Sequence, residues 1–246
     1  MITITIVRRI LATFFATLAL FPTLFLPGFS SIRRLDDPLH IQLKFLIHFD
    51  FELAEQDVYI ERDRGSGQVF RITRGDHDKK AELFATTSEN PRDPFNPAAL
   101  GPFRKVLSLG ILLGEWLDQS GSGVYTCENG DGNLDLTFAN LVPKGVYSLW
   151  HSFMPLPPSV PYSGTLDLPL GARDGSETTF SADGDGNASF VQTFHPCLQM
   201  SDTWITSMLV VSYHSDGETH GGSPGDFGYN AHSPLFLMLP LRHRIK

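Results

Sequence analysis

A succession of short alternating segments, separated by turn residues, constrains the fold of this 246-residue chain more than any other feature. Apolar and polar residues alternate strictly at 134–138, as in a strand with one buried face. Gly, Asp and Asn residues at 130–133 and 183–187 supply turns between such segments. About seven strands, with turns roughly every ten residues, predict an all-β fold: a Greek-key β-sandwich or a β-barrel.

One short helix is expected near residues 106–119, where it would cap a sheet. Five apolar residues of this stretch recur at the spacing of one helical face: Leu109, Leu112, Leu113, Trp116 and Leu117. Gly110 and Gly114 weaken the pattern, because Gly in a helix costs about 1 kcal/mol relative to Ala. We expect Trp116 in the core, together with Trp150 and Trp204.

The composition divides the chain into four stretches. They are a leader at 1–30, an N-terminal β segment at 35–87, a Pro-rich connector at 88–102 and a β-sandwich domain at 103–241. Four prolines in the connector oppose regular structure there: Pro91, Pro94, Pro97 and Pro102.

The leader has the pattern of an export signal. Arg8 and Arg9 precede an uncharged apolar stretch at 10–32, and small residues at Gly28 and Ser30 have the spacing that a signal peptidase reads. A membrane anchor through residues 10–32 is the alternative, because the stretch could span a bilayer and two arginines follow it. Both interpretations predict an extracytoplasmic location: secreted, periplasmic or at the cell surface.

The two cysteines are Cys127 and Cys197. An even count in an exported protein predicts one disulfide between them. The alternative is a pair of buried free thiols.

The charge of the chain argues against one class of partner. Asp and Glu number 27 and Lys and Arg 19, for a formal net charge of −8. An acidic protein repels phosphate backbones, so we expect no nucleic-acid partner.

A histidine-containing loop is the strongest candidate for a site. His214 ends an apolar strand, and the Gly-rich loop that follows, to residue 226, carries Asp216 and His220. His151 follows another predicted strand, and His232 lies soon after the loop. If these strand ends meet, three or four of the imidazoles could converge and, with the Asp216 carboxylate, hold a divalent metal such as copper, zinc or calcium. The alternative is a structural loop, in which polar side chains bind backbone amides and the glycines supply positive φ.

Two other motifs do not indicate sites. Asp183, Asp185 and Asn187 resemble the start of a calcium loop, but the required Gly and Glu are missing, and a polar hairpin turn explains them better. Gly221-x-Ser223-x-Gly225 matches the nucleophile-elbow pattern without the helix that the elbow requires.

Several longer segments carry a family resemblance. They are LGEWL at 113–117, NLVPKGVYSLW at 140–150, LPLGARDGS at 168–176 and YHSDGETHG at 213–221. Together they resemble a family of exported bacterial and archaeal β-sandwich proteins of unknown function, over about residues 90–240. The resemblance implies export and a sandwich fold, and it implies no activity.

A second, weaker likeness is to copper–zinc superoxide dismutase, in the order of segments 140–145, 182–188 and 209–211. The His-x-His copper pair of that enzyme is absent, since the strand here reads YSLWH at 147–151. The likeness therefore implies a Greek-key sandwich and transfers no activity.

Three functions follow as hypotheses from these features. The favoured one is an exported, non-catalytic binding protein of unknown ligand, with a divalent metal held at residues 214–226. One alternative is a metal-dependent enzyme, redox or hydrolytic, at the same loop. The other is a structural protein of the cell envelope, in which the loop is scaffolding.

Overall fold

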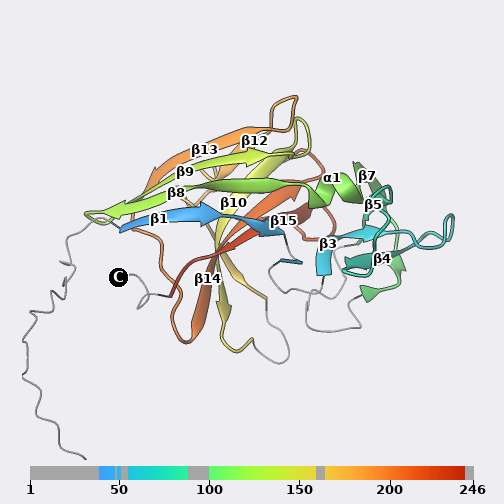
Figure 1. The fold of residues 1–246 in the computed structure, drawn as a ribbon, viewed down its shortest axis with the longest axis horizontal. Helices are drawn as coiled ribbons and strands as arrows, with labels where there is room; N and C mark the ends of the chain where they lie inside the picture. Colours follow the sequence, from blue (N-terminus) through green and yellow to red (C-terminus); the bar gives the residue numbers. More distant parts are fainter. Residues whose placement is uncertain (1–38, 48, 51–54, 88–99, 159–163, 242–246) are drawn as a thin grey trace, which may run out of the picture. The chain divides into compact units, whose positions relative to one another are not determined.

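The computed structural model describes residues 39–47, 49–50, 55–87, 100–158 and 164–241. Within these ranges the chain is almost entirely β, in open antiparallel sheets with one short helix (Figure 1). The predicted all-β sandwich is confirmed, and the described strands do not close into a barrel. The predicted leader, the apolar stretch at 10–32 and residues 88–99 of the connector lie outside the described residues. In the described ranges no helix has the length and apolar character to cross a membrane.

Sheet A has four strands. In spatial order they are β1 (Leu39–Lys44), β8 (Ser120–Glu128), β9 (Asp131–Ala139) and β13 (Ala188–Phe194). The alternation read from the sequence appears directly in β9, where Leu134, Leu136 and Phe138 are buried and the residues between them are exposed. Sheet A therefore has one face in the core and one polar face in solvent.

Sheet B packs on the apolar face of sheet A. Its strands run in the order β11 (Leu166–Pro169), β10 (Val146–Pro155), β14 (Ile205–His214), β15 (Ala231–Met238) and β2 (Leu46–Ile47), and β12 (Thr179–Ser181) also pairs with β10. Leu149 and Val211 face the core between the sheets, whereas Trp150, Val210 and Phe236 form a second buried cluster on the outer face. Because both faces are covered, β14 is buried almost throughout, including its polar residues Thr206, Ser207, Ser212 and His214.

The connections interleave the two sheets. The chain leaves β9 for sheet B and returns to place β13 beside β9, then crosses again to place β14 beside β10. Interleaved crossings of this kind are typical of Greek-key sandwiches. They bring segments that are distant in the sequence together, such as β10 and β14.

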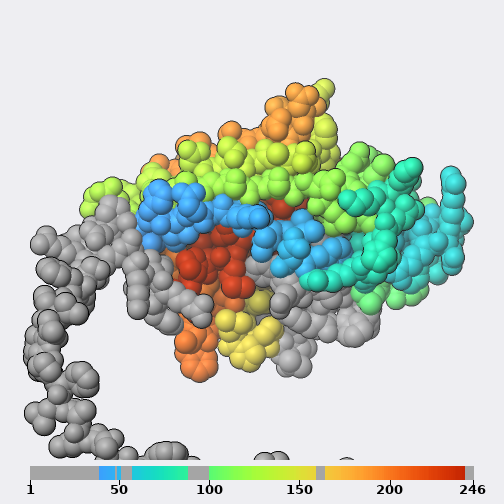
Figure 2. All heavy atoms as spheres, in the orientation of Figure 1, coloured from blue at the N-terminus to red at the C-terminus, as the bar shows by residue number. Residues whose placement is uncertain are grey.

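The N-terminal β segment contributes to every sheet. β1 pairs with β8 and β2 pairs with β15, so one continuous segment joins the edges of sheets A and B. In Figure 2 this segment (blue) lies between the green of β8 and the red of β15. A third sheet follows the order β6 (Phe103–Arg104), β4 (Gln68–Thr73), β3 (Glu55–Ile60), β5 (Glu82–Ala85) and β7 (Leu107–Leu112).

The helix is shorter than the sequence pattern indicated. It spans only Leu113–Leu117 (α1), and the residues before it form β7, which pairs with β5. Gly110 adopts φ 65°, a left-handed conformation that a right-handed helix cannot contain. The helix begins where Glu115 Oε2 accepts the Leu112 backbone N–H at 2.8 Å. Its Leu113 and Trp116 side chains are buried, as predicted.

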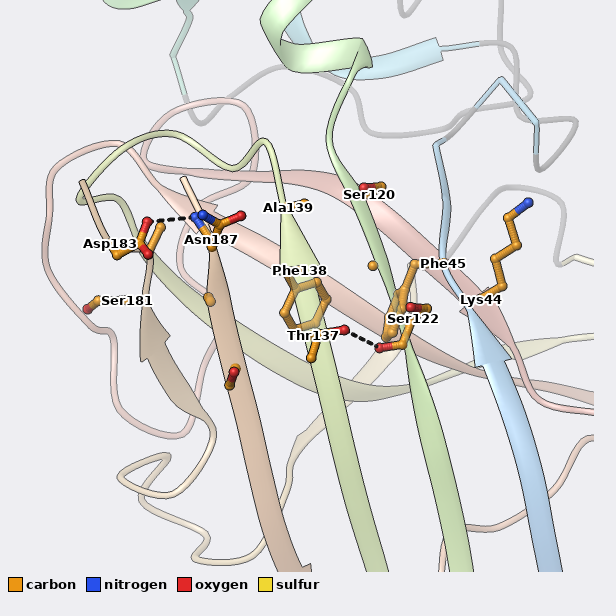
Figure 3. Close-up of a pocket in the computed structure, with 14 residues that line it drawn as sticks. Lys44, Phe45, Ser120, Ser122, Thr137, Phe138, Ala139, Ser181, Asp183 and Asn187 are labelled. Atoms are coloured by element: carbon orange, nitrogen blue, oxygen red, sulfur yellow. Dashed lines mark hydrogen bonds between the residues drawn. The ribbon is translucent and has the colours of Figure 1, made fainter. Parts of the chain in front are cut away.

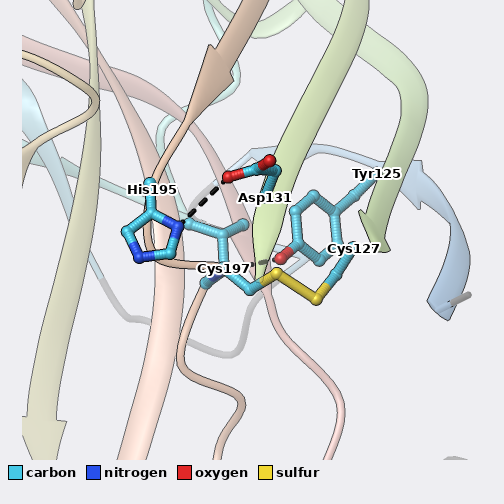
Figure 4. The surroundings of a disulfide bond; sticks show 6 residues. Tyr125, Cys127, Asp131, His195 and Cys197 are labelled. Carbon is cyan, nitrogen blue, oxygen red and sulfur yellow. Dashed lines mark hydrogen bonds and ion pairs between the residues drawn. A yellow bond between two sulfur atoms is a disulfide. The ribbon is translucent and has the colours of Figure 1, made fainter. Parts of the chain in front are cut away.

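The disulfide between Cys127 and Cys197 is confirmed (Figure 4). It joins the end of β8 to the segment after β13, across a sequence separation of 70 residues. Beside it the Tyr125 hydroxyl accepts the Leu198 backbone N–H at 2.8 Å. Near the bond, His195 Nδ1 also lies 3.1 Å from an Asp131 carboxylate oxygen. The bond and the Tyr125 hydrogen bond fix the segment after β13 against sheet A.

Candidate functional site

His214 is the last residue of β14, and its ring lies on the outer face of sheet B. Its Nε2 is 2.7 Å from Ser148 Oγ, which also accepts the indole N–H of Trp150 at 2.6 Å. Ser148 and Trp150 are two residues apart on β10 and therefore share this face. The imidazole is 2 % exposed. The strand pairing thus holds His214 by one nitrogen in a buried position.

The loop after β14 turns back over this ring. The rings of His214 and His220 have centroids 5.3 Å apart, and His220 Nε2 is 3.3 Å from Asp216 Oδ2. Gly225 has φ 87°, and a β-carbon there would lie 2.8 Å from the His220 ring. The glycine is therefore needed twice, for its backbone conformation and for the close packing of His220. We call His214, Asp216 and His220 the histidine cluster.

A second loop closes the cluster from the side. The connection between β11 and β12 packs its backbone directly on the loop after β14, since a β-carbon on Gly175 would clash with the Gly221 carbonyl oxygen. The two loops leave the inner nitrogens of the cluster little access to solvent.

Two imidazole nitrogens of the cluster are buried without a hydrogen-bond partner among the described residues. They are His214 Nδ1 and His220 Nε2. The second is within ion-pair distance of Asp216 but is not aligned for a hydrogen bond with it. The hydroxyl of Ser212, two residues before His214 on the same strand, is also buried and unpartnered. A buried polar atom without a hydrogen bond destabilises the folded state by about 1–3 kcal/mol. These atoms would therefore gain from a ligand that binds them.

The His214 imidazole has a strongly lowered pKa. Burial lowers the pKa of His214 to about 4, and the nearby His220 ring adds to the decrease, while the Asp216 carboxylate opposes it. The imidazole is therefore neutral at neutral pH. A neutral imidazole has the free lone pair that a metal ion requires.

His232 does not join the cluster. Cross-strand pairing puts it opposite Tyr213, on the face of sheet B that His214 does not share. Its Nδ1 donates to the Asp57 carbonyl oxygen at 2.8 Å, and its Nε2 is 3.1 Å from Ser215 Oγ. Burial lowers its pKa, so it is a neutral core histidine with both nitrogens engaged.

His151 lies still farther away. His214 pairs with Val146, five residues along β10, which corresponds to about 17 Å of strand. The His151 ring also faces the other side of the sheet, where its Nε2 is 2.8 Å from Ser207 Oγ and 3.3 Å from the Gln199 carbonyl oxygen. The predicted convergence of three or four imidazoles is therefore wrong, because only His214 and His220 come together, with Asp216 beside them.

His151 should make the fold sensitive to acid. Burial lowers its pKa to about 4, against about 6.5 in an unfolded chain, so protons favour unfolding as the pH falls through this interval. We expect His151 to contribute a loss of about 2 kcal/mol of stability between pH 7 and pH 5. Urea unfolding of His151→Gln and wild type over this range measures the contribution. The exposed His40, changed to Gln, is the control, and equal pH slopes in wild type and His151→Gln would contradict the assignment.

The chemistry of the cluster is more limited than its residue types suggest. Among the described residues, no three His, Cys, Asp or Glu side chains are arranged as ready ligands of one metal ion. The Ser148–His214 contact has the distance of a nucleophile–base pair, but both side chains are at most 2 % exposed. The Trp150 N–H also occupies the Ser148 oxygen. Burial and the Trp150 hydrogen bond therefore argue against a hydrolytic dyad here.

Sequence reasoning missed Ser148 and Trp150, which orient His214. The signal was present in the alternation of β10: residues 148 and 150 share one face and His151 takes the other. The Asp183 motif, in contrast, is the polar turn that was expected, because Asp183 Oδ1 accepts the backbone N–H groups of Asp185 and Asn187.

Comparison with known proteins adds no assignment: no protein-family model, no curated protein and no solved structure matches the chain.

Proposed function

We propose that this chain is an exported, non-catalytic binding protein that holds a transition-metal ion at the histidine cluster. The single observation that carries the proposal is a pair of buried nitrogens, His214 Nδ1 and His220 Nε2, that make no hydrogen bond among the described residues and belong to rings with centroids 5.3 Å apart. The Asp216 carboxylate, beside His220, would supply a third donor after a movement of the loop. An ion would satisfy both nitrogens at once.

The donor set favours zinc or copper over calcium. Imidazole nitrogens suit zinc and copper, whereas calcium takes six to eight oxygen ligands. Asp216 is the one carboxylate within the cluster, and its Oδ1 already accepts the Glu218 backbone N–H at 3.1 Å. Binding requires His220 and Asp216 to move toward His214, which the glycines at 217, 221 and 225 of the loop allow.

Burial favours binding over catalysis. A catalytic metal needs an open coordination position that substrate can reach. Here the two loops pack backbone to backbone beside the cluster, and His214 is buried. The Cys127–Cys197 disulfide supports the export part of the proposal, because such bonds persist in oxidising compartments.

A titration with zinc and copper tests the proposal. Calorimetry on tag-free protein should give one site per chain, with an affinity at least tenfold weaker in Asp216→Asn and at least a hundredfold weaker in His220→Gln. His151→Gln is the matched control, since it also removes a buried imidazole but lies outside the cluster, and it should titrate like wild type.

Two results would overturn the proposal. One is wild-type protein that binds neither ion at micromolar concentrations while remaining folded. The other is His220→Gln protein that binds as tightly as the wild type, which would put the ion elsewhere.

A further inference from the structure

A group of apolar side chains lies at the surface at one end of sheet B. Its residues come from the end of β10, the start of β11 and the start of β14, and are Met154, Leu156, Leu166, Trp204 and Ile205. Trp204 is 73 % exposed, Leu166 59 % and Leu156 36 %. We call these five residues the apolar tip. In Figures 1 and 2 the end of β10 (yellow) and the segment before β14 (orange) lie together at the lower edge of the sandwich.

Strand pairing makes the apolar tip contiguous. The Leu156 backbone N–H donates to the Trp204 carbonyl oxygen at 2.7 Å, one step beyond the last pair of β10 and β14. Opposite residues of an antiparallel pair project to the same face, so the Leu156 and Trp204 side chains are neighbours. A hollow of about 300 Å³ beside them is lined by Met154, Leu166 and Ile205. Contiguous exposed apolar residues of this kind mark interaction surfaces.

The turn before β14 holds Trp204 in its exposed position. Asp202 Oδ1 accepts the backbone N–H groups of Trp204 and Ile205 at 2.7 and 2.8 Å. Ser201 Oγ donates to the Leu239 carbonyl oxygen at 2.7 Å and so fixes the turn to the segment after β15. The fold therefore maintains the exposure of this indole ring.

Basic residues follow in the chain directly beside this turn. Leu241 forms a parallel bridge with Ser201, three residues before Trp204. The sequence continues as RHRIK at 242–246, in which two Arg and one Lys are cationic at neutral pH. In the described parts of 153–168 and 201–206 the charged side chains are Asp167 and Asp202. Cations therefore outnumber carboxylates here by three to two, whereas the whole chain has a net charge of −8.

The solvent face of sheet A has a different character. A hollow of about 910 Å³ lies there, and Lys44, Ser122 and Thr137 line it from neighbouring strands (Figure 3). The phenyl rings of Phe45 and Phe138 beneath it are buried in the core and offer it no apolar surface. The apolar tip is therefore the better candidate for contact with an apolar partner.

We propose that the apolar tip inserts into the interface of a bilayer that contains anionic lipids, and that the basic residues after Leu241 contact the lipid headgroups. Trp is enriched at membrane–water interfaces, because its ring is apolar and its N–H can stay hydrated. Binding at such an interface increases with the apolar area inserted and with the attraction of basic residues to anionic lipids.

The size of the apolar tip favours a bilayer over a protein partner. A standard protein interface uses about 20–30 residues on each side. Five residues at the end of two long strands suit shallow insertion instead. The inference is independent of the metal proposal, since none of the histidine cluster belongs to the tip.

The fluorescence of Trp204 tests the inference in the full chain. Trp116 and Trp150 are buried, so a change of emission on addition of vesicles reports on Trp204. With vesicles of phosphatidylcholine and phosphatidylglycerol in equal parts, we expect the emission to shift to shorter wavelengths and quenching by acrylamide to decrease. Trp204→Phe should show neither change. A chain attached to the vesicles through another segment alone would leave Trp204 in water and its emission unchanged.

Two variants separate the apolar and the basic contributions. Leu166→Asp should weaken vesicle binding at least tenfold, because it places a charge in the inserted surface. Val191→Asp is the matched control, since Val191 is an exposed apolar residue on sheet A, and this variant should bind like wild type. Arg242→Gln/Arg244→Gln should weaken binding at least threefold and make it less sensitive to salt.

Three results would overturn the inference. One is Trp204 emission that does not respond to the anionic vesicles. Another is folded Leu166→Asp that binds as the wild type does; if this variant does not fold, Leu156→Asp replaces it. The third is a shift to shorter wavelengths that appears without vesicles and increases with protein concentration, which would assign the apolar tip to a second copy of the chain.

Discussion

Replacing Cys127 and Cys197 with Ser will lower the free energy of unfolding by about 4 kcal/mol. The disulfide closes a loop with a sequence separation of 70 residues and so restricts the unfolded chain strongly. It also holds the segment after β13 against sheet A, beside the Tyr125–Leu198 hydrogen bond. Urea unfolding of the double variant and of the oxidised wild type measures the difference.

The reduced wild type is the matched control for this variant. With a reductant present, the two proteins should unfold at similar urea concentrations, and the variant should not respond to the reductant. A double variant as stable as the oxidised wild type would show that the strand pairing alone fixes this segment.

Trp116→Ala will destabilise the protein by about 3–5 kcal/mol. Trp116 is 1 % exposed and makes edge-on contacts with Tyr213 and His232, at centroid distances of 6.4 Å. Helix α1 follows β7 of the third sheet, so this side chain links that sheet to sheet B. The expected loss reflects both the apolar area and the cavity that the indole would leave.

Trp204→Ala provides the comparison, because Trp204 is 73 % exposed and the same change there should cost at most about 0.5 kcal/mol. Thermal and urea unfolding of both variants give the two values. Similar losses for the two tryptophans would contradict the packing described here.

Trp204 lies on the surface, and its predicted place in the core is wrong. All three tryptophans were expected in the core, and Trp116 and Trp150 are buried there. Trp204 precedes β14, in a turn where Asp202 Oδ1 accepts the backbone N–H groups of Trp204 and Ile205. Composition alone cannot distinguish an aromatic residue on a strand from one on a turn, whereas the Asp two residues earlier indicates the turn.

The helix was predicted too long for a related reason. An apolar run of six to ten residues fits a strand edge as well as a helix face, and periodicity does not separate the two. In the structure, the left-handed conformation of Gly110 excludes a helix at this position, so residues 107–112 form a strand. The φ angle of a single Gly cannot be inferred from the sequence.

The sequence predicts three members of the histidine cluster correctly and wrongly adds His151 and His232, and strand geometry explains the difference. His214, Asp216 and His220 lie within seven residues, so the local loop brings them together. To place His151 and His232, one must know the register of β10 and β15 against β14 and the face of sheet B on which each side chain lies. The two-residue period of β10 already separates His151 from Ser148, but only the pairing of β10 with β14 shows that Ser148 faces His214.

Elemental analysis is the most direct test of a metal ion at the histidine cluster. The full chain would be produced by export, purified without a histidine tag and analysed for zinc and copper. We expect close to one equivalent of zinc or copper per chain, retained through dialysis and lost in His214→Ala/His220→Ala. Folded wild type that holds no metal, and takes none up from micromolar zinc or copper, would contradict this expectation.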